Sequence, residues 1–284
     1  MQYRITFLGT GTSTGVPLIG CQCPICTSED ERDKRLRSSV LVEAFPKSAL
    51  KNHTGSGIAG SDGTGLVTNS EGTQPLTILI DAGPDFRQQM LRVKVKSLDG
   101  ILLTHEHWDH VAGLDDVRAL NFLTRRPVPV YGEQRVLDNI QKVFSYAFVN
   151  QYLPGLPKIT LHTIENREFS LGGVSVIPVR AYHNKLPVYG FRIGPFGYLT
   201  DANYIDNCEL DKFTGVEVFV VSTVMKTPHR SHFALDDAIQ VGRRTGARQI
   251  YLTHMSHRLG PYETFCEELP PGVAPAYDGL VVEL

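Results

Sequence analysis

Short runs of apolar residues recur along the whole chain, and most have the length of a strand. Several contain at least four consecutive apolar residues, which is typical of strands that are covered on both faces. We therefore predict strands over residues 3–9, 39–45, 76–83, 100–105, 128–132, 159–164, 174–181, 189–194, 197–201, 216–222, 249–254 and 279–284.

Apolar residues spaced three and four apart occur between these strands and predict amphipathic helices. The predicted helices cover 86–93, 114–123, 133–148 and 234–245. Ser231 or His232 is the expected start of the last helix, and Gly246 is its expected end. Because helices are interleaved with strands in both halves of the chain, we predict two sheets sandwiched between helices.

Residues 46–75 differ from the rest of the chain, because they are rich in Gly, Ser and Thr and lack apolar periodicity. This composition is typical of flexible loops and linkers, so we predict an insertion between two strands. The chain has 284 residues, and α/β domains often reach 200–250 residues. We therefore interpret residues 1–284 as one domain that carries this insertion.

Composition excludes a disordered chain, and the net charge argues against a large basic surface. Hydrophobic residues make up 42% and charged residues 20%, so the chain has enough apolar surface for a core and is not disordered. Its 28 basic and 30 acidic residues give a net charge of −2, which disfavours a large nucleic-acid surface. Since neither a signal peptide nor an 18-residue apolar run is visible, we expect a soluble, cytoplasmic protein without a membrane partner.

The segment THEHWDHVAG (104–113) concentrates metal-binding side chains directly after a predicted strand. His105, His107, Asp109 and His110 all lie within six residues. Imidazole and carboxylate groups suit divalent zinc, manganese or iron. Because neighbouring residues of a strand end point in different directions, His105 and His107 can serve one ion while Asp109 and His110 serve a second.

Two ions require further ligands, and three polar residues occur where other predicted strands end. These residues are His183, Asp201 and His254. Together with the first motif they complete a set of seven ligands. Asp201 is the carboxylate that we expect to bridge both ions.

Three of the five cysteines crowd into the sequence CQCPIC, as Cys21, Cys23 and Cys26. In a reducing compartment this spacing favours a metal site over a disulfide. Cys208 and Cys266 are isolated, and we expect them to be structural.

The motif THEHWDH, followed by a later single His, Asp and His, resembles the metallo-β-lactamase superfamily of binuclear hydrolases. The resemblance implies an α/β (α+β) fold, the αββα sandwich of two mixed sheets flanked by helices, with the metal site at one edge. It assigns the first ion to His105, His107 and His183, the second to Asp109, His110 and His254, and the bridge to Asp201. It also implies that Asp81, in ILIDAG, orients a ligand histidine.

The sequences LGTGTSTGVPLIGCQCPIC, SHF and LTHMSH are similar to the cyclic-phosphate phosphodiesterases of the carbon–phosphorus lyase pathway. This resemblance implies a structural zinc bound by Cys21, Cys23, Cys26 and His257. Three thiolates and one imidazole make a closed tetrahedral site, in agreement with that role. The resemblance also places His232 near the metals, as a general acid or a phosphate contact, with His229 as a competitor.

The expected mechanism follows from two divalent ions. Mn²⁺ and Zn²⁺ are the expected metals, and Fe is an alternative. They lower the pKa of a water molecule, whose hydroxide attacks phosphorus in line. His232 is the candidate donor of a proton to the leaving oxygen, and Asp109 is counted as catalytic as well as a ligand. The expected substrate is a small phosphodiester, and the resemblance suggests a cyclic ribose phosphate. Homodimerisation is left open.

Two alternative functions remain. A tRNA 3′-processing nuclease would use the same ions but needs a basic substrate arm, whereas the insertion contains only Lys47 and Lys51 as basic residues. A non-hydrolytic accessory protein, similar to the pyrroloquinoline quinone biosynthesis factor, would share the cysteine arrangement. Because none of the seven ligands is missing, this alternative is also disfavoured.

Overall fold

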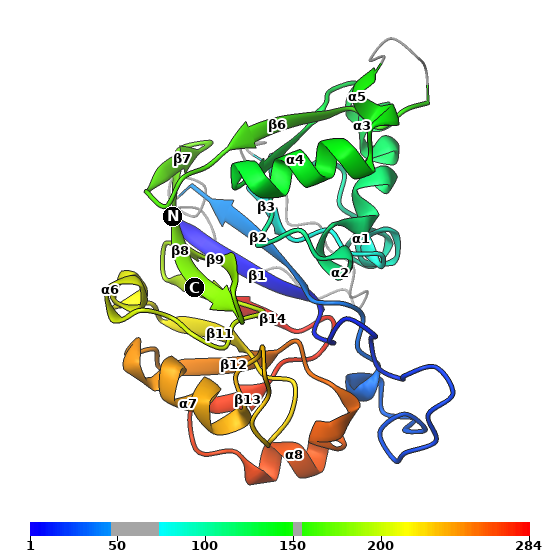
Figure 1. The fold of residues 1–284 in the computed structure, drawn as a ribbon. Helices are drawn as coiled ribbons and strands as arrows, with labels where there is room; N and C mark the ends of the chain where they lie inside the picture. The colour runs from blue at the N-terminus through cyan, green and yellow to red at the C-terminus, as the bar shows by residue number, and fades with distance from the viewer. Residues whose placement is uncertain (47–73, 150–154) are drawn as a thin grey trace, which may run out of the picture.

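Two seven-stranded sheets stack face to face in the computed structural model, which describes residues 1–46, 74–149 and 155–284 (Figure 1). In spatial order, the first sheet contains β14 (Val281–Glu283), β1 (Gln2–Gly9), β2 (Ser39–Phe45), β3 (Leu76–Ile80), β4 (Gly100–Leu102), β5 (Val128–Gly132) and β6 (Ile159–Thr163). The second contains β13 (Val273–Pro275), β12 (Gln249–Thr253), β11 (Val218–Ser222), β10 (Phe196–Leu199), β9 (Leu186–Ile193), β8 (Val174–His183) and β7 (Phe169–Leu171). The predicted insertion at 46–75 lies almost entirely outside the described residues.

Both sheets follow the same pairing pattern. From β14 to β3 the neighbours are antiparallel, and from β3 to β6 they are parallel. In the second sheet the neighbours are antiparallel from β7 to β10 and parallel from β10 to β13. Each sheet is therefore mixed, and its parallel half brings several carboxyl ends of strands to one edge.

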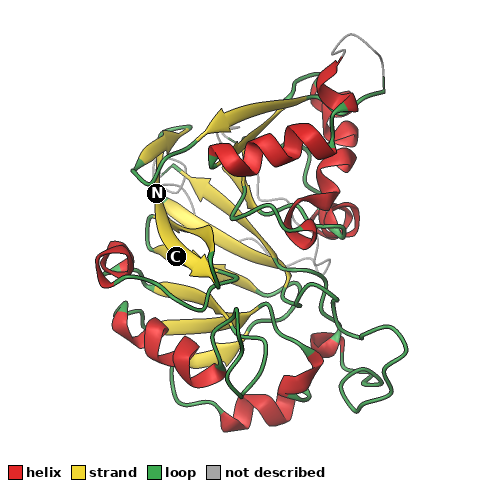
Figure 2. Ribbon diagram, in the orientation of Figure 1, coloured by secondary structure: helices red, strands yellow, loops and turns green. Residues whose placement is uncertain are grey.

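Helices cover the outer face of each sheet, which completes the predicted four-layer sandwich (Figure 2). Those on the first sheet are α1 (Phe86–Val93), α2 (Trp108–Val111), α3 (Arg118–Thr124), α4 (Gln134–Val143) and α5 (Tyr146–Val149). Those on the second are α6 (Asn207–Leu210), α7 (Leu235–Arg244) and α8 (Tyr262–Glu268). Among the described residues, no helix combines the length and hydrophobicity that a membrane span requires.

Three details differ from the sequence predictions. The helix expected over 133–148 is divided into α4 and α5, because the backbone of Phe144 leaves the helical region (φ −101°, ψ 35°). The helix expected at 114–123 starts as a 3₁₀ helix over Ala112–Val117. Helix α7 is capped by Ala234, so the expected start at Ser231 or His232 was wrong, and both residues lie in the preceding loop. Gly246 follows the helix end with φ +77°, as expected.

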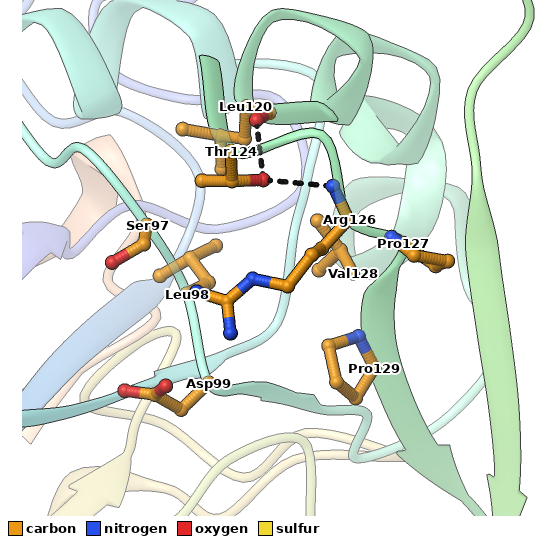
Figure 3. Close-up of a pocket in the computed structure, with 9 residues that line it drawn as sticks. All are labelled: Ser97, Leu98, Asp99, Leu120, Thr124, Arg126, Pro127, Val128 and Pro129. Carbon is orange, nitrogen blue, oxygen red and sulfur yellow. Dashed lines mark hydrogen bonds between the residues drawn. The ribbon is translucent and has the colours of Figure 1, made fainter. Parts of the chain in front are cut away.

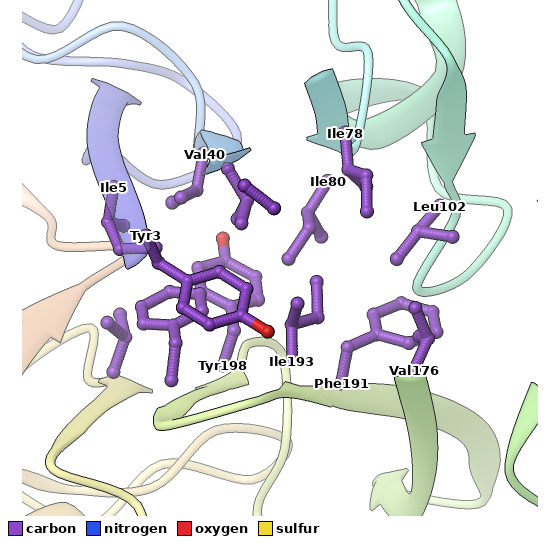
Figure 4. Packing of buried hydrophobic residues seen from close by; sticks show 14 of the residues in the cluster. Tyr3, Ile5, Val40, Ile78, Ile80, Leu102, Val176, Phe191, Ile193 and Tyr198 are labelled. Atoms are coloured by element: carbon purple, nitrogen blue, oxygen red, sulfur yellow. The ribbon is translucent and has the colours of Figure 1, made fainter. Parts of the chain in front are cut away.

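The core between the sheets holds their relative position. Side chains such as Val40 and Ile80 of the first sheet face Val176 and Phe191 of the second, all fully buried (Figure 4). Two further clusters join each sheet to its own helices. Because protein interiors are densely packed, this core fixes the strand ends that carry the site.

Candidate metal centre

The predicted ligands converge at one edge of the sandwich. His105 and His107 follow β4, and Asp109 and His110 lie on the single-turn helix α2 that begins immediately afterwards. The remaining ligands come from the second sheet, where His183 ends β8, Asp201 follows β10 and His254 follows β12.

Two of these ligands leave their strands through left-handed backbone conformations. Asp201 has φ +51° and His254 has φ +54°, and Asp81 of the first sheet has φ +61°. Such conformations are strained for residues other than glycine, and strain of this kind clusters at functional sites. All three turns follow strand ends, next to the other predicted ligands or, for Asp81, in contact with His110.

Six imidazoles follow one another in a closed circle. Centroids of successive rings lie 4.5, 5.1, 4.5, 5.1, 5.7 and 4.3 Å apart along the circle His105, His107, His183, His232, His254, His110 and back to His105. Ligand atoms within 4.8 Å of one another form three groups: Asp109–His110–Asp201–His254, His105–His107–Asp201 and His183–Asp201–His232. The structure thus brings all seven predicted ligands together.

Asp201 belongs to all three groups, and this is the geometry expected of a bridging carboxylate. Its Oδ1 lies 3.4 Å from His110 Nε2 and 3.2 Å from His254 Nε2. Its Oδ2 lies 4.0 Å from His105 Nε2 on the other side. The carboxylate of Asp109 contacts only the histidines of its own group, at 3.2 Å from His110 Nε2 and 3.4 Å from His254 Nε2.

In three of the histidines a neighbouring group contacts Nδ1, so that Nε2 is the nitrogen that faces the centre. Nδ1 of His110 donates to Asp81 Oδ2 at 2.7 Å, and Nδ1 of His183 donates to the Ser231 carbonyl at 2.6 Å. Nδ1 of His105 lies 3.0 Å from the hydroxyl of Thr104, which also contacts Asp81. The Nε2 lone pairs are therefore left for an ion, as in metal sites whose ligand histidines are oriented by a second hydrogen bond.

The electrostatics of the centre also fit cations. Burial raises the pKa of Asp201, but His254 and His110 outweigh it and hold that pKa below its usual range. The pKa of Asp109 is lowered by the same two histidines, again despite burial. Burial lowers the pKa of His105, whereas three carboxylates, Asp201 first, raise that of His110 despite its burial. Nε2 of both His105 and His110 is buried without a hydrogen-bond partner among the described residues. Divalent ions would satisfy these nitrogens and displace the proton from His110.

His232 faces the same centre from the loop before α7. Its Nδ1 is buried, has no hydrogen-bond partner among the described residues and lies 4.0 Å from Asp201 Oδ2. Burial lowers its pKa to about 3, so the imidazole is neutral near pH 7. His229 lies behind it, with ring centroids 5.1 Å apart. The geometry therefore favours His232 over His229 as the contact to a bound molecule, and its role as proton donor stays a prediction.

The predicted zinc ligands form a separate group. Nδ1 of His257 lies 3.3, 3.4 and 3.5 Å from the sulfurs of Cys21, Cys23 and Cys26. Tetrahedral zinc, with bonds of about 2.3 Å to sulfur and about 2.0–2.1 Å to nitrogen, places such atoms about 3.5 Å apart. A backbone hydrogen bond at Cys26 lowers the pKa of Cys23 to about 6, which favours its thiolate. The four residues therefore fit a closed zinc site.

Sequence reasoning missed two features beside the metal motif. Arg135 of α4 donates to Glu106, between the first two ligand histidines, and to the Pro187 carbonyl at 2.7 Å, so it ties this loop to β9. Trp108, inside the motif itself, is 58% exposed and carries an unassigned aromatic surface. In contrast, a cavity of about 150 Å³ beside α3 contains none of the predicted site residues (Figure 3).

Comparison with known proteins identifies the family. Residues 77–255 match the model of the beta-lactamase superfamily domain. The chain is 36% identical over 279 residues to a Porphyromonas gingivalis protein named octanoyltransferase, and this alignment covers 98% of the chain and 51% of the relative. It is 30% identical over 150 residues to the coenzyme PQQ synthesis protein B of Methylobacterium radiotolerans, covering 48% of the chain and 39% of the relative. The chain thus spans about half or less of the length of these curated relatives.

A solved structure matches over nearly the full length of both chains. A crystal structure described as a new diphosphatase from the PhnP family has a TM-score of 0.82 and 34% sequence identity. The match covers 100% of this chain and 98% of that one. The chain therefore belongs to the beta-lactamase superfamily and, within it, to the PhnP family.

Proposed function

We propose that the chain is a metal-dependent phosphodiesterase that hydrolyses small phosphodiesters, including cyclic ones such as phosphoribosyl cyclic phosphate. The observation that carries the proposal is the position of Asp201, whose two oxygens face different groups of histidines. A carboxylate shared in this way supports a pair of adjacent ions, and paired ions suit displacement at phosphorus. The diphosphatase relative supports phosphorus as the reacting centre.

The chain's own residues would divide the work as follows. His105, His107 and His183 would hold one ion, whereas Asp109, His110 and His254 would hold the other. When bound, the two ions supply hydroxide near neutral pH and neutralise charge on the phosphoryl oxygens. Asp81 and Thr104 keep His110 and His105 in the required orientation. His232, whose Nδ1 lies 4.0 Å from Asp201 Oδ2, would contact the leaving oxygen. Because its imidazole is neutral near pH 7 in the free protein, a role as general acid requires that it gains a proton in the substrate complex.

The name of the Porphyromonas gingivalis relative suggests a different reaction, acyl transfer. The alignment covers only 51% of that protein. Its name therefore describes a molecule about twice as long as the region that this chain matches. The side chains that the structure groups around Asp201 are histidines and Asp109. This set suits divalent ions that activate water, so the centre favours attack by water.

The deciding experiment is a substrate panel with the protein loaded with Mn²⁺ or Zn²⁺. Methyl ribofuranoside 2,3-cyclic phosphate, bis(4-nitrophenyl) phosphate, a precursor tRNA and an octanoyl thioester would be compared, with Asp201→Asn as the inactive variant and Asp206→Asn as its control. We expect Asp201-dependent hydrolysis of the two small diesters. Exclusive cleavage of the tRNA or the thioester would overturn the proposal, and no turnover of any substrate would favour an accessory role.

A further inference from the structure

Arg135, on the first turn of α4, contacts both of the segments that supply ligands for the first predicted ion. One end of its guanidinium, Nη1, donates to the carboxylate of Glu106, which stands between His105 and His107. The other end, Nη2, donates to the carbonyl of Pro187 on β9 at 2.7 Å. Glu106 follows β4 of the first sheet, whereas β9 belongs to the second. One side chain therefore connects the two sheets at the loop that carries the ligands.

A backbone hydrogen bond makes a second connection between the same two segments. The Tyr189 N–H donates to the Thr104 carbonyl at 3.0 Å. The two connections are two residues apart on each segment, at Thr104 and Glu106 on one and at Tyr189 and Pro187 on the other. The ligand His105 lies between them. The loop is thus docked against β9 on both sides of this ligand, once by the main chain and once through the guanidinium.

Strand β9 in turn fixes the third ligand of this ion. It pairs with β8 in antiparallel register, with Leu186 opposite His183. Pro187, whose carbonyl accepts from Arg135, is therefore the immediate neighbour of the residue that pairs with a ligand. The imidazoles of His183 and His107 also lie against each other, with ring centroids 5.1 Å apart. The ligands from the two sheets thus meet where Arg135 connects the sheets.

The ligands of the second ion have no part in these connections. Asp109 and His110 lie on α2, and His254 follows β12, which is separated from β9 by β11 and β10. The hydrogen bonds of Arg135 within the described part of the chain reach none of these three residues. The orientation of His110 depends instead on Asp81, which accepts from its Nδ1.

Neighbouring charges hold the guanidinium of Arg135 in this position. Glu133, the residue before α4, has a carboxylate oxygen 3.5 Å from Arg135 Nη2. The same carboxylate accepts from Arg180 of β8 at 2.6 and 3.1 Å, and the Arg180 guanidinium lies over the Tyr189 ring, 4.0 Å from its centroid. Charges therefore alternate from Glu106 to Arg180 across the two sheets. Since all four charged side chains are partly buried, water and salt screen them less than they screen surface pairs.

We propose that Arg135 is a positioning residue for the first ion alone. By holding the loop of His105 and His107 against the strand that pairs with His183, it raises the affinity of that ion and leaves the second ion unaffected. A planar guanidinium serves two partners at once in a fixed geometry, which a lysine ammonium does not. The inference rests on the two-ion centre of the proposed function, but not on the identity of the substrate.

Titration with Mn²⁺ in two single-ion backgrounds tests the proposal without turnover. Asp109→Ala should bind only the first ion of the centre and His107→Ala only the second, while the cysteine site keeps zinc, because thiolates do not suit Mn²⁺. Electron paramagnetic resonance measures the free Mn²⁺. In the first background, adding Arg135→Met should weaken Mn²⁺ binding by about tenfold, the lower end of the range for groups that orient metal ligands. In the second background it should change nothing.

Two further variants separate positioning from a general loss of structure. Arg192→Met is the matched control, because Arg192 also lies on β9 and donates to two carbonyls, those of Lys212 and Thr214, at 2.8 and 2.9 Å. It should leave Mn²⁺ binding unchanged in both backgrounds. Arg135→Lys keeps the charge but not the fork, so its affinity for the first ion should lie between those of the parent and of Arg135→Met.

Several results would overturn the positioning role: equal weakening in both backgrounds, weakening of the second ion only, or no weakening in either. A background that bound no Mn²⁺ would do so as well, because the ions would then bind only as a pair. Failure of the proposed function looks different. If the affinities change as expected while no phosphodiester is hydrolysed, the function is wrong and the positioning role stands. If the small diesters are hydrolysed and Arg135→Met leaves the first ion unchanged, the function stands and the positioning role is wrong.

Discussion

Asp81 and Asp201 approach the imidazole of His110 from opposite sides. Asp81 Oδ2 lies 2.7 Å from Nδ1, and Asp201 Oδ1 lies 3.4 Å from Nε2. Each aspartate follows the strand at which its sheet changes from antiparallel to parallel pairing, and each has a positive φ and a fully buried alanine after it. The same backbone turn therefore occurs once in each sheet. Asp81 is enclosed by Thr104 and His110 and orients a ligand, whereas Asp201 faces the centre.

The first prediction concerns Asp81. Asp81→Asn keeps the shape of the side chain but weakens the hydrogen bond that orients His110. Loss of such an orienting group typically costs 10- to 100-fold in metal affinity, so we expect a weakening of about that size with the fold retained. Isothermal titration with Mn²⁺ or Zn²⁺ checks it. Asp99→Asn is the control, because Asp99 also accepts a backbone hydrogen bond but contacts no predicted ligand. Equal affinities of all three proteins would show that Asp81 has no such role.

The second prediction distinguishes a shared ligand from an unshared one. Asp201→Ala should lose both ions of the centre, whereas Asp109→Ala should retain about one of them, because Asp109 contacts only one ligand group. Metal analysis after reconstitution and desalting measures both stoichiometries, with the zinc at the cysteines subtracted. If Asp201→Ala kept one ion as firmly as Asp109→Ala does, Asp201 would not be the bridge.

The third prediction concerns the cysteine site. Cys23→Ser should lower the zinc content and the melting temperature together, the latter by at least about 5 °C, because metal binding at a closed site adds to folding free energy. Cys208→Ser is the matched control, since Cys208 is an exposed thiol on α6. Loss of turnover with unchanged stability would contradict a structural role for this zinc.

The fourth prediction is a pH dependence of stability at Asp278. Burial raises its pKa to about 6, although Leu36 N–H and the Thr10 hydroxyl both donate to its carboxylate. Between pH 4 and 6 the native state therefore holds a proton that the unfolded chain has released. The stabilisation that this bound proton gives the native state is present in full below pH 4 and is lost as the pH rises through 6.

Denaturant unfolding at pH 4, 5, 6 and 7 tests this dependence. The stability of the wild type relative to Asp278→Asn should fall by about 2–3 kcal/mol over that range. Other titrating groups are the same in both proteins and cancel in the difference. A difference that did not vary with pH would mean that Asp278 ionises normally in the folded protein.

Most of the fold could be predicted because its strands are continuous apolar runs that leave a clear signal in the sequence. The metal ligands could be predicted because four of them lie within residues 105–110 and the others follow such runs. Short elements such as β7 and β13 were missed, since three residues carry no periodicity. Their existence depends on pairing with a neighbouring strand.

Contacts between distant segments could not be predicted. The parallel stacking of Trp108 on Phe144 depends on the break that ends α4, and no local pattern of residues 133–148 indicates where that helix breaks. The position of His232 likewise depends on how the loop between β11 and α7 returns to the centre, where the Ser231 carbonyl accepts from His183. Tertiary packing decides both.

The last prediction concerns His232. If this residue protonates the leaving oxygen, His232→Ala should keep the ions and the fold but lose turnover of an alkyl cyclic phosphate by about 10²–10⁴-fold. The loss should be much smaller with bis(4-nitrophenyl) phosphate, because nitrophenolate leaves without a proton. A residue that only binds phosphate would instead weaken both substrates alike, mainly through KM. If His232 were an ion ligand with His183 and Asp201, the variant would lose metal as well. Metal content and the two substrates, measured on His232→Ala and on His229→Ala as its neighbour control, therefore separate the three roles, and equal losses on both substrates with full metal content would exclude the general acid.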